Sequence, residues 1–315
     1  MSSYLAMSNF DEFLETHNIS IMVSMEADHA VLLLRPSAAA FTIPIRKPLG
    51  LCFHNDRLLL SSVGKENRIW EYCFKHNAFL LNRVHVLEGW HYIHELTFSE
   101  DVPVFNSTGT NSLRTVNSAE AYPIIYSPPG LPEEWLRRDE RHPKVLWMNS
   151  LAKVGDEWAY SCFSKNPYCK WDAEGYPVFT CMDKKGAVYV GNNVVCEGLT
   201  VPHSVRFWDD RLWVCNSGYG EFGYIDDAGA FQATIEVPGW TRGCYWWNNF
   251  CFVAYSKLYE PRVRQYAPFF EGKESSCGIV VLDGGTDEVA HVKLHDWLQV
   301  FDLIVMEGSV NIEAY

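Results

Sequence analysis

Several features that would place this sequence in a familiar class are missing from it. No stretch approaches the ~20 apolar residues that a membrane span needs, and residues 1–16 lack the basic start and apolar core of a secretory signal. There is no Gly-rich phosphate loop, zinc-binding cysteine cluster, nucleophile elbow or Rossmann fingerprint. We therefore expect a cytoplasmic protein that has no membrane partner, and the sequence indicates no organic cofactor.

Positive charge is also scarce. The 315 residues include 26 Lys and Arg against 39 Asp and Glu, and the formal net charge of −13 is spread along the chain. This balance argues against a surface that follows phosphates, so no nucleic-acid partner is expected. An internal channel can still carry the opposite sign to the outer surface, which leaves a small anionic molecule as the expected ligand.

The ten cysteines show no CxxC spacing. Five of them lie inside predicted strands beside other apolar residues: Cys52, Cys73, Cys215, Cys244 and Cys251. This placement favours reduced cysteines that pack in the interior of a cytoplasmic protein over a disulfide scaffold.

What the sequence does contain is a repeated unit: an apolar strand, a hairpin turn, and a second apolar strand that ends near Ser. Five copies open at Leu49, Ile93, Met148, Pro202 and Thr241. Copies of one such unit at spacings of roughly 40–55 residues are typical of a β-propeller, with one copy in each blade. A sixth opening, Val300–Val305, has almost no chain after it, so its blade needs strands from the other end of the sequence.

We therefore predict an all-β fold, a six-bladed β-propeller closed by N-terminal strands that complete the C-terminal blade. One domain spans residues 1–315. Residues 1–16 form an N-terminal extension, 17–47 with 300–307 the shared closing blade, and 48–299 the other five blades. The expected closing strands are Ile19–Met25, Ala30–Arg35, Phe41–Ile45 and Phe301–Met306. A short helix is predicted at Pro132–Arg138, where Pro stands at its start.

The first strand of each propeller blade lines the central channel, so the residues that open the six copies are predicted to be neighbours in space. These residues are Gly50, His94, Asn149, His203, Arg242 and Asp302. Five of the six are polar or charged, and apolar strands have no need of such side chains at their ends. Convergent polar residues in a concave place are what a ligand-binding or active site requires.

Two chemistries fit this set. In the first, His94 and His203 bind a divalent metal ion together with Asp302 or Asn149. In the second, one His is a general acid or base, Asp302 orients it, and Arg242 with Arg206 holds an anionic group. The competing interpretation is a network of polar side chains that only fills the channel.

Further binding residues are expected near the ends of the second strands. Ser217 and Glu221 lie in a turn-rich, glycine-containing stretch, where backbone NH groups can approach a ligand closely. Lys257, Glu260 and Arg262 lie at the start of a long, charged and aromatic loop. We predict that all five contact the substrate.

Three stretches resemble the signature of an uncharacterised, mostly bacterial β-propeller family known as a domain of unknown function. They are Pro202–Phe207, Arg211–Glu221 and Pro238–Gly243, which carry its PHSxR, LWVxNSGxGE and PGxTRG patterns. The resemblance covers roughly Pro48 to Glu307 and implies the propeller fold without a reaction. The chain departs from the family where Trp147 replaces a His, and where Ser256–Glu260 lacks an Arg. A metal site that used that His would be impaired here.

These observations leave two functions. The first is an enzyme that acts on a small anionic metabolite at the hub by His-based acid/base or His–metal chemistry of the lyase, isomerase or hydrolase type. The second is a non-catalytic propeller that holds a protein partner. An enzyme should keep its hub open, whereas a scaffold should bury its hub residues in mutual hydrogen bonds.

Overall fold

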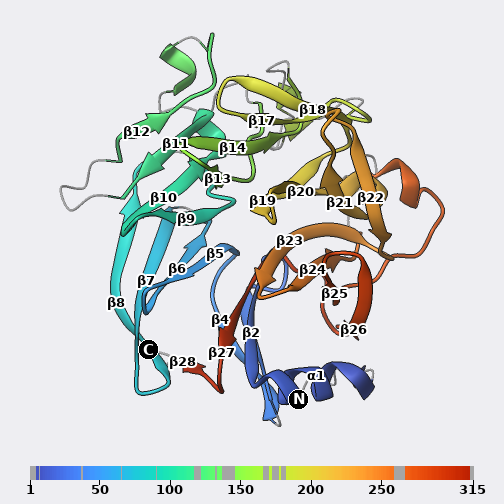
Figure 1. Ribbon diagram of the computed structural model, residues 1–315. Helices are drawn as coiled ribbons and strands as arrows, with labels where there is room; N and C mark the ends of the chain where they lie inside the picture. Colours follow the sequence, from blue (N-terminus) through green and yellow to red (C-terminus); the bar gives the residue numbers. More distant parts are fainter. Residues whose placement is uncertain are drawn as a thin grey trace.

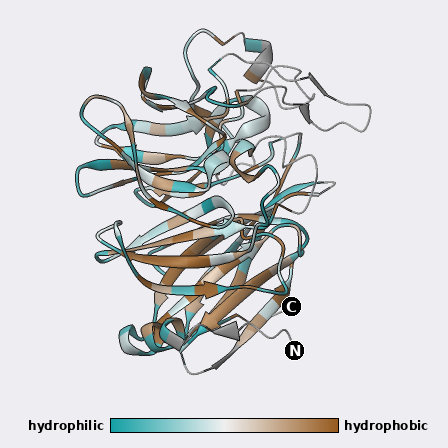
Figure 2. Cartoon of the chain, turned by 90° about the vertical axis from the view of Figure 1, so that its right-hand side faces the viewer, coloured by the Kyte–Doolittle hydropathy of each residue, from teal (hydrophilic) through white to brown (hydrophobic). Residues whose placement is uncertain are grey.

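The computed structural model describes residues 5–6, 8–36, 38–64, 66–89, 91–116, 122–131, 133–136, 146–165, 170–171, 177–178, 182–258 and 267–312. Within these residues, six sheets of four or five strands, antiparallel apart from one edge pair, surround a common centre as the blades of a propeller (Figure 1). Figure 2 shows apolar residues concentrated on the strands and polar residues in many of the connections. The predicted six-bladed β-propeller is confirmed.

The blade that closes the ring joins the two ends of the chain. Its innermost strand is β27 (Asp302–Glu307), followed outward by β2 (Ile19–Met25), β3 (Ala30–Arg35) and β4 (Ala38–Pro44). Ser24 of β2 pairs with Asp302 of β27 across 278 residues of sequence. Closure by N-terminal strands is therefore confirmed, and it removes the free edges that an open ring would leave.

The other five blades follow the order of the sequence, each from an inner to an outer strand. The first contains β5 (Pro48–His54), β6 (Arg57–Ser62), β7 (Asn67–Lys75) and β8 (Ala78–Leu87); the second β9 (Leu96–Ser99), β10 (Val102–Ser107), β11 (Ser112–Thr115) and β12 (Ile124–Tyr126); the third β13 (Ala152–Val154), β14 (Glu157–Cys162), β17 (Gly186–Val190) and β18 (Asn193–Leu199); the fourth β19 (Pro202–Trp208), β20 (Arg211–Asn216), β21 (Glu221–Ile225) and β22 (Phe231–Glu236); the fifth β23 (Trp240–Trp247), β24 (Phe250–Ser256), β25 (Gly278–Asp283) and β26 (Asp287–Lys293).

Short elements complete the described chain. Two small strands extend outer edges: β1 (Leu5–Ala6) pairs with β26, and β28 (Asn311–Ile312) pairs with β8. The remaining elements are the hairpin of β15 (Lys170–Trp171) and β16 (Pro177–Val178) and the 3₁₀ turns η1 (Thr108–Thr110), η2 (Glu133–Leu136), η3 (Ser217–Tyr219) and η4 (Pro268–Phe270). The helix predicted at Pro132–Arg138 is thus a single 3₁₀ turn within its described part.

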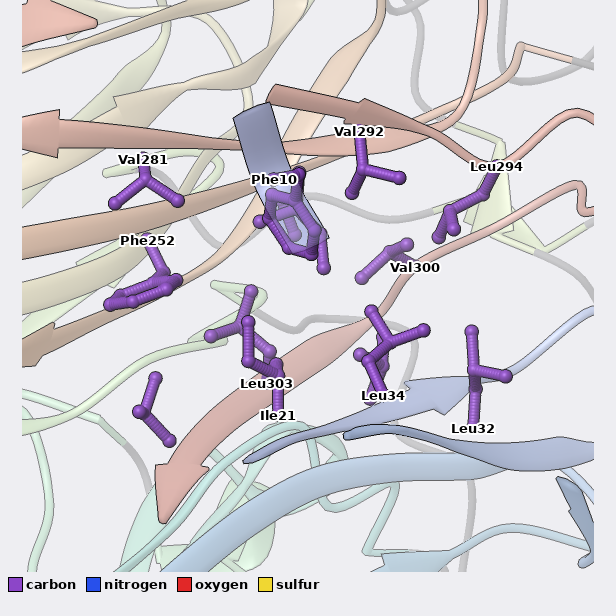
Figure 3. Close-up of a cluster of buried hydrophobic side chains, with 14 of the residues drawn as sticks. Phe10, Ile21, Leu32, Leu34, Phe252, Val281, Val292, Leu294, Val300 and Leu303 are labelled. Atoms are coloured by element: carbon purple, nitrogen blue, oxygen red, sulfur yellow. The ribbon is translucent and has the colours of Figure 1, made fainter. Parts of the chain in front are cut away.

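The N-terminal residues contain one α-helix, α1 (Ser8–His17), which packs against β2 and β26. Phe10, Phe13 and Leu14 occur at the i, i+3 and i+4 spacing that places side chains on one face of a helix. All three are buried in the cluster between the fifth and the closing blade, where Phe10 meets side chains of several strands (Figure 3). Burying such a ring contributes about 1.5–3 kcal/mol, so α1 stabilises the closure of the ring.

The inner strands contact one another around the axis. β5 contacts both β9 and β27, and β23 contacts both β19 and β27 (Figure 1). The ends of these strands carry the hub residues.

All eight cysteines of the described residues are free thiols, and six of them are buried. None of the helices in the described part of the chain is long and apolar enough to cross a membrane.

Candidate functional site

Eight side chains from five blades line one cavity at the hub. They are His94, Glu95, Asn149, His203, Ser204, Arg242, Phe301 and Asp302. The structure thus brings together all five polar residues predicted from the strand openings. The cavity leaves about 10 Å³ for the centre of a water molecule, which is room for about one water. The hub is therefore nearly closed.

Irregular backbone at the strand openings allows so many side chains to meet there. The register with the second strand shifts between Pro48 and Leu51, between His203 and Arg206, and between Thr241 and Cys244. A bulge of this kind turns a side chain that regular pleating would point elsewhere.

Glycine fills the opening positions where the blades come closest. A Cβ on Gly50 would lie 2.7 Å from the carbonyl oxygen of His94, and one on Gly243 would lie 2.7 Å from the Cα of Asp302. Real side chains do not come this close to backbone atoms. Gly50 therefore belongs to the hub ring as predicted, but it serves the packing of the blades and does not line the cavity.

His94 is held as a neutral ring with its proton on Nδ1. This atom lies 3.2 Å from the carbonyl oxygen of Tyr92 and 2.8 Å from Oγ1 of Thr108. The Thr108 hydroxyl donates its own proton to the carbonyl of Met148, so it accepts from the ring. Burial, reinforced by the charge of Arg242, lowers the pKa of His94 to about 3. Its Nε2 is therefore left with a lone pair.

His203 repeats this arrangement two blades further on. Its Nδ1 lies 2.8 Å from Oγ of Ser217, and a hydrogen bond to the Val201 backbone favours the protonated ring. Burial is nevertheless dominant and, with the charges of Arg242 and His94, holds the pKa of His203 well below its usual range. The Ser217 hydroxyl is able either to donate to Nδ1 or to accept from it, and Nε2 has no protein partner.

The residues two positions before these hub side chains have left-handed backbones. The φ angles are +50° at Tyr92, +59° at Trp147 and +53° at Val201. A β-branched residue such as Val201 rarely adopts this conformation, which costs of order 1–3 kcal/mol. Strain of this kind, repeated at one place in three consecutive blades, tends to accumulate at functional sites.

Two uncharged side chains at the cavity each have a buried polar atom without a protein partner. Asn149 is 3% exposed and His203 is 4% exposed. Oδ1 of Asn149 accepts a hydrogen bond of 2.7 Å from Oγ of Ser161, whereas its Nδ2 has no partner, and neither does Nε2 of His203. An unsatisfied buried group costs about 1–3 kcal/mol, so this pair marks a place where a ligand or water belongs.

A buried cluster of charges lies at the side of the cavity. Nη1 of Arg206 forms an ion pair with Glu95, and its Nη2 lies 3.9 Å from Oδ1 of Asp302. Asp302 also accepts hydrogen bonds of 2.9 Å from the backbone NH groups of Leu51 and Leu303. Burial raises the pKa of Glu95 to about 8 and that of Asp302 to about 6, against the attraction of Arg206.

This cluster changes the role predicted for Arg206, and the cavity includes residues that the prediction missed. Arg206 is not among the residues that line the cavity, and its Nε also donates to the carbonyl oxygen of Cys244 at 2.9 Å, so its guanidinium is occupied inside the protein. Glu95 lines the cavity and was missed, because the alignment of repeats selected only His94 at that opening. Ser204, with a φ of +50°, and Phe301 were missed for the same reason.

Arg242 is the one cation among the residues that line the cavity. Its Cζ lies 4.1 Å from the centre of the Phe301 ring, and its Nη2 lies 3.9 Å from Oε2 of Glu26. The ring contact orients the guanidinium at the side of the cavity. Arg242 thus brings positive charge to the hub.

Aromatic side chains enclose the two histidines. The ring of His94 lies 4.8 Å from that of Tyr92 and 5.9 Å from that of Trp147. The ring of His203 lies 5.1 Å from that of Phe163 and 6.0 Å from that of Trp240. We call Tyr92, Trp147, Phe163 and Trp240 the aromatic collar. Trp147, which stands where the resembling family has a His, is thus a neighbour of His94.

Three further predicted binding residues, Ser217, Glu221 and Lys257, are not among the residues that line the cavity. Ser217 supports His203, and Glu221 accepts a 2.7 Å hydrogen bond from Nδ2 of Asn216. Lys257 is exposed. Glu260 and Arg262 lie outside the described residues, so their predicted role stays a prediction.

The predicted metal site has two nitrogen donors, His94 and His203, at one cavity. Among the described residues there is no group of three or more His, Cys, Asp or Glu side chains arranged to hold a metal ion. A divalent metal at the hub stays a prediction.

Fold and hub together define a six-bladed β-propeller with a polar, nearly closed centre. The chain belongs to the family described as a domain of unknown function, DUF4915, whose model matches residues 8–314. This membership confirms the resemblance to an uncharacterised propeller family. A search of curated proteins found no relative of this chain.

Solved structures with the same architecture have diverse roles. A protein of unknown function from Bacteroides caccae matches 92% of this chain and 99% of its own with a TM-score of 0.57 and 8% identity. A chain of a nidogen/laminin complex matches 91% of this chain and 98% of its own with a TM-score of 0.59 and 8% identity. A gluconolactonase from Xanthomonas campestris matches 92% of both chains with a TM-score of 0.53 and 15% identity. At such identities the likeness shows the fold alone.

Proposed function

We propose that the hub binds a small anionic molecule and that the protein is an enzyme of the lyase, isomerase or hydrolase type. The observation that carries this proposal is the pair of unpartnered buried atoms, Nδ2 of Asn149 and Nε2 of His203, at the same cavity as Arg242. In a hub that only filled the channel, we would expect both atoms to have hydrogen-bond partners within the protein. A buried polar atom without such a partner destabilises the folded state by about 1–3 kcal/mol.

The chemistry available at the hub is proton transfer beside a bound anion. His94 and His203 place neutral rings at the cavity, because burial, followed by the charge of Arg242, lowers the pKa of both. An anion that binds Arg242 offsets this charge and makes both rings better proton acceptors. Asp302, whose pKa is raised to about 6 by burial, is the group able to exchange a proton near neutral pH, whereas the carboxylate of Glu95 is paired with Arg206.

A second candidate function rests on the closure of the hub. The cavity holds about one water, and most hub side chains are engaged with other protein groups, as expected for a non-catalytic propeller that uses its faces to hold a protein partner. One of the similar folds, in the nidogen/laminin complex, belongs to a protein–protein assembly. An enzyme of this shape needs the aromatic collar to move before any ligand larger than a water enters.

Ligand-induced stabilisation separates the two candidates. Thermal unfolding is followed while acetate, phosphate and sulfate are titrated into wild type, His203→Ala and Arg242→Gln, with Arg211→Gln as the control because Arg211 stacks on Tyr224 away from the hub. We expect stabilisation of wild type and the control, and none in folded hub variants. Equal responses in all four proteins, or a His203→Ala variant that does not fold, would favour the non-catalytic function.

We infer that the protein works in the cytoplasm. The eight free thiols in the described part of the chain support a reducing compartment. The dispersed net charge of −13 supports a small anionic ligand at a local positive group over a nucleic-acid or membrane partner.

A further inference from the structure

We infer that the protein has a second binding site, a cleft between the closing blade and the first blade that takes an aromatic phosphate monoester. The phosphate group is held by Arg46 and Arg68, and the aromatic ring packs against Trp70. This site lies outside the hub and does not depend on the function proposed above.

The cleft lies where the two blades meet. Leu60 and Trp70 of the first blade pack in one apolar cluster with Ile43 of the closing blade, and the two blades are neighbours in the ring (Figure 1). The cleft has a volume of about 400 Å³ and is lined by Arg46, from the turn after β4, and by residues of β6, β7 and their connection. This volume is within the range of small-molecule sites, whereas the hub cavity holds about one water.

Each of the two blades contributes one guanidinium group to the cleft. Arg46 is exposed and makes no hydrogen bond or ion pair with any residue that the structure describes. Nη2 of Arg68 lies 2.9 Å from Oε2 of Glu66, and these two side chains are 43% and 53% exposed. An ion pair as exposed as this one contributes little to stability, so a ligand with a greater negative charge than one carboxylate competes with Glu66 for Arg68.

Two uncharged donors line the cleft beside these cations. Oγ of Ser62 accepts a 2.9 Å hydrogen bond from Nε1 of Trp70, which leaves the hydroxyl proton for a ligand. The backbone NH of Gly64 makes no hydrogen bond with another described residue, and a Cβ at this position would lie 3.7 Å from Cδ and Nε of Arg46. Guanidinium, hydroxyl and backbone NH groups are therefore close together. A phosphate monoester, with a charge of about −1.5 to −2 and three strong acceptor oxygens, matches this set better than a carboxylate.

Trp70 provides the apolar side of the cleft. Its hydrogen bond to Ser62 fixes the orientation of the indole, and Cζ of Arg68 lies 5.9 Å from the centre of the ring. Val63 is the other apolar side chain that lines the cleft. A flat ring attached to the phosphate group gains packing energy against the indole, and aromatic pairs gain more than their buried area alone provides. The ligand class is therefore an anionic group joined to a ring.

The experiment compares phenyl phosphate with methyl phosphate, which has the same anionic group but no ring. Affinities for the full chain are measured by isothermal titration calorimetry at low ionic strength. We expect phenyl phosphate to bind roughly 10-fold more tightly than methyl phosphate. Arg46→Gln and Arg68→Gln should each weaken binding of phenyl phosphate roughly 10-fold, because each removes charge-assisted hydrogen bonds. Glu66→Gln should strengthen it several-fold, because the carboxylate that competes for Arg68 is then absent. Arg83→Gln, at an exposed position of β8 outside the cleft, is the control.

The outcomes separate this site from the hub. The hub variant Arg242→Gln should bind phenyl phosphate as wild type does. Binding that is lost in Arg242→Gln but unchanged in Arg46→Gln would assign the ligand to the hub and overturn the inference. Equal affinities for phenyl and methyl phosphate, or no binding of phenyl phosphate by wild type, would overturn it as well and leave the proposed function to its own test. Circular dichroism establishes that the variants are folded, which we expect because Arg46, Glu66 and Arg68 have exposed side chains.

Discussion

Nδ1 of His203 lies 2.8 Å from Oγ of Ser217, fourteen residues further along the chain. The same spacing and distance relate His94 to Thr108 two blades earlier. In both cases the histidine lies at the opening of a blade, and the hydroxyl lies in a 3₁₀ turn directly after the second strand, η3 or η1. The hairpin of each blade thus supplies the group that orients its own histidine.

Ser217→Ala tests whether this contact positions the ring. We expect a loss of about 1 kcal/mol in the free energy of unfolding in urea, because one buried hydrogen bond is removed. We also expect the stabilisation by added phosphate to fall several-fold, because the His203 ring is then oriented less firmly at the cavity. Ser309→Ala, at an exposed position, is the control. A purely structural role would leave the response to phosphate and the ¹⁵N shifts of the His203 ring unchanged in Ser217→Ala.

The ion pair of Arg206 and Glu95 joins the fourth blade to the second across 111 residues of sequence. Arg206→Met should cost about 3–5 kcal/mol, because it leaves a buried carboxylate without its cation. The double variant Arg206→Met, Glu95→Leu should be more stable than Arg206→Met alone, since both charges are then absent. Urea unfolding of the full double-mutant cycle measures the coupling. Strictly additive losses would show that the two side chains do not depend on each other.

The stability of the protein should depend on pH through His94. Because its pKa falls from 6.5 to about 3 on folding, the unfolded chain binds the proton first as the pH drops below 6.5. The contribution of the neutral ring is therefore complete above pH 6.5 and is lost toward pH 3, at no more than about 1.4 kcal/mol for each pH unit.

A comparison with His94→Gln isolates this effect. The raised pKa values of Asp302 and Glu95 act in the opposite direction, because their contributions are lost as the pH rises, but both proteins retain these groups. We expect the difference in the free energy of unfolding between wild type and His94→Gln to shrink as the pH is lowered below 6.5. A difference that is independent of pH would mean that His94 protonates freely in the folded protein.

Gly243→Ala should be strongly destabilising. Its Cβ would lie 2.7 Å from the Cα of Asp302 and 2.9 Å from Oδ1 of the same residue, so the fifth and closing blades would have to separate. We expect a loss of at least about 1–3 kcal/mol, as for overpacking of an interior. Gly64→Ala is the matched control, because its nearest neighbours lie at 3.7 Å. Equal melting temperatures of the two variants would show that the hub tolerates a wider ring.

The sequence predicted the fold well because the repeat is local. Each copy carries its own strands and turn, so five copies and one incomplete copy establish the number of blades without any long-range information. The closure by β2 to β4 with β27 followed from the same count, since a blade with one strand at the C-terminus needs strands from elsewhere. The packing of α1 against the closing blade was not predicted, because three apolar residues in a polar segment give only a weak amphipathic pattern.

The hub was predicted in part. His94, Asn149, His203, Arg242 and Asp302 do line one cavity, because equivalent positions of equivalent strands meet at the axis. Ser204 escaped notice because the change in register between His203 and Arg206 adds a second residue at that opening, and such a change is not visible in an alignment of repeats. Glu95 escaped notice because the alignment took one residue, His94, from its opening. The partner of Arg206 lies in another blade, and no pattern in the sequence indicates which carboxylate that is.

The most direct test of the central claim is a high-resolution crystal structure of the protein grown with phosphate. The account predicts electron density for the anion at the hub, beside Arg242 and within hydrogen-bonding distance of Nδ2 of Asn149. A hub that holds only a water molecule, with no stabilisation of the protein by any added anion in solution, would contradict it and leave the centre of the propeller as a purely structural plug.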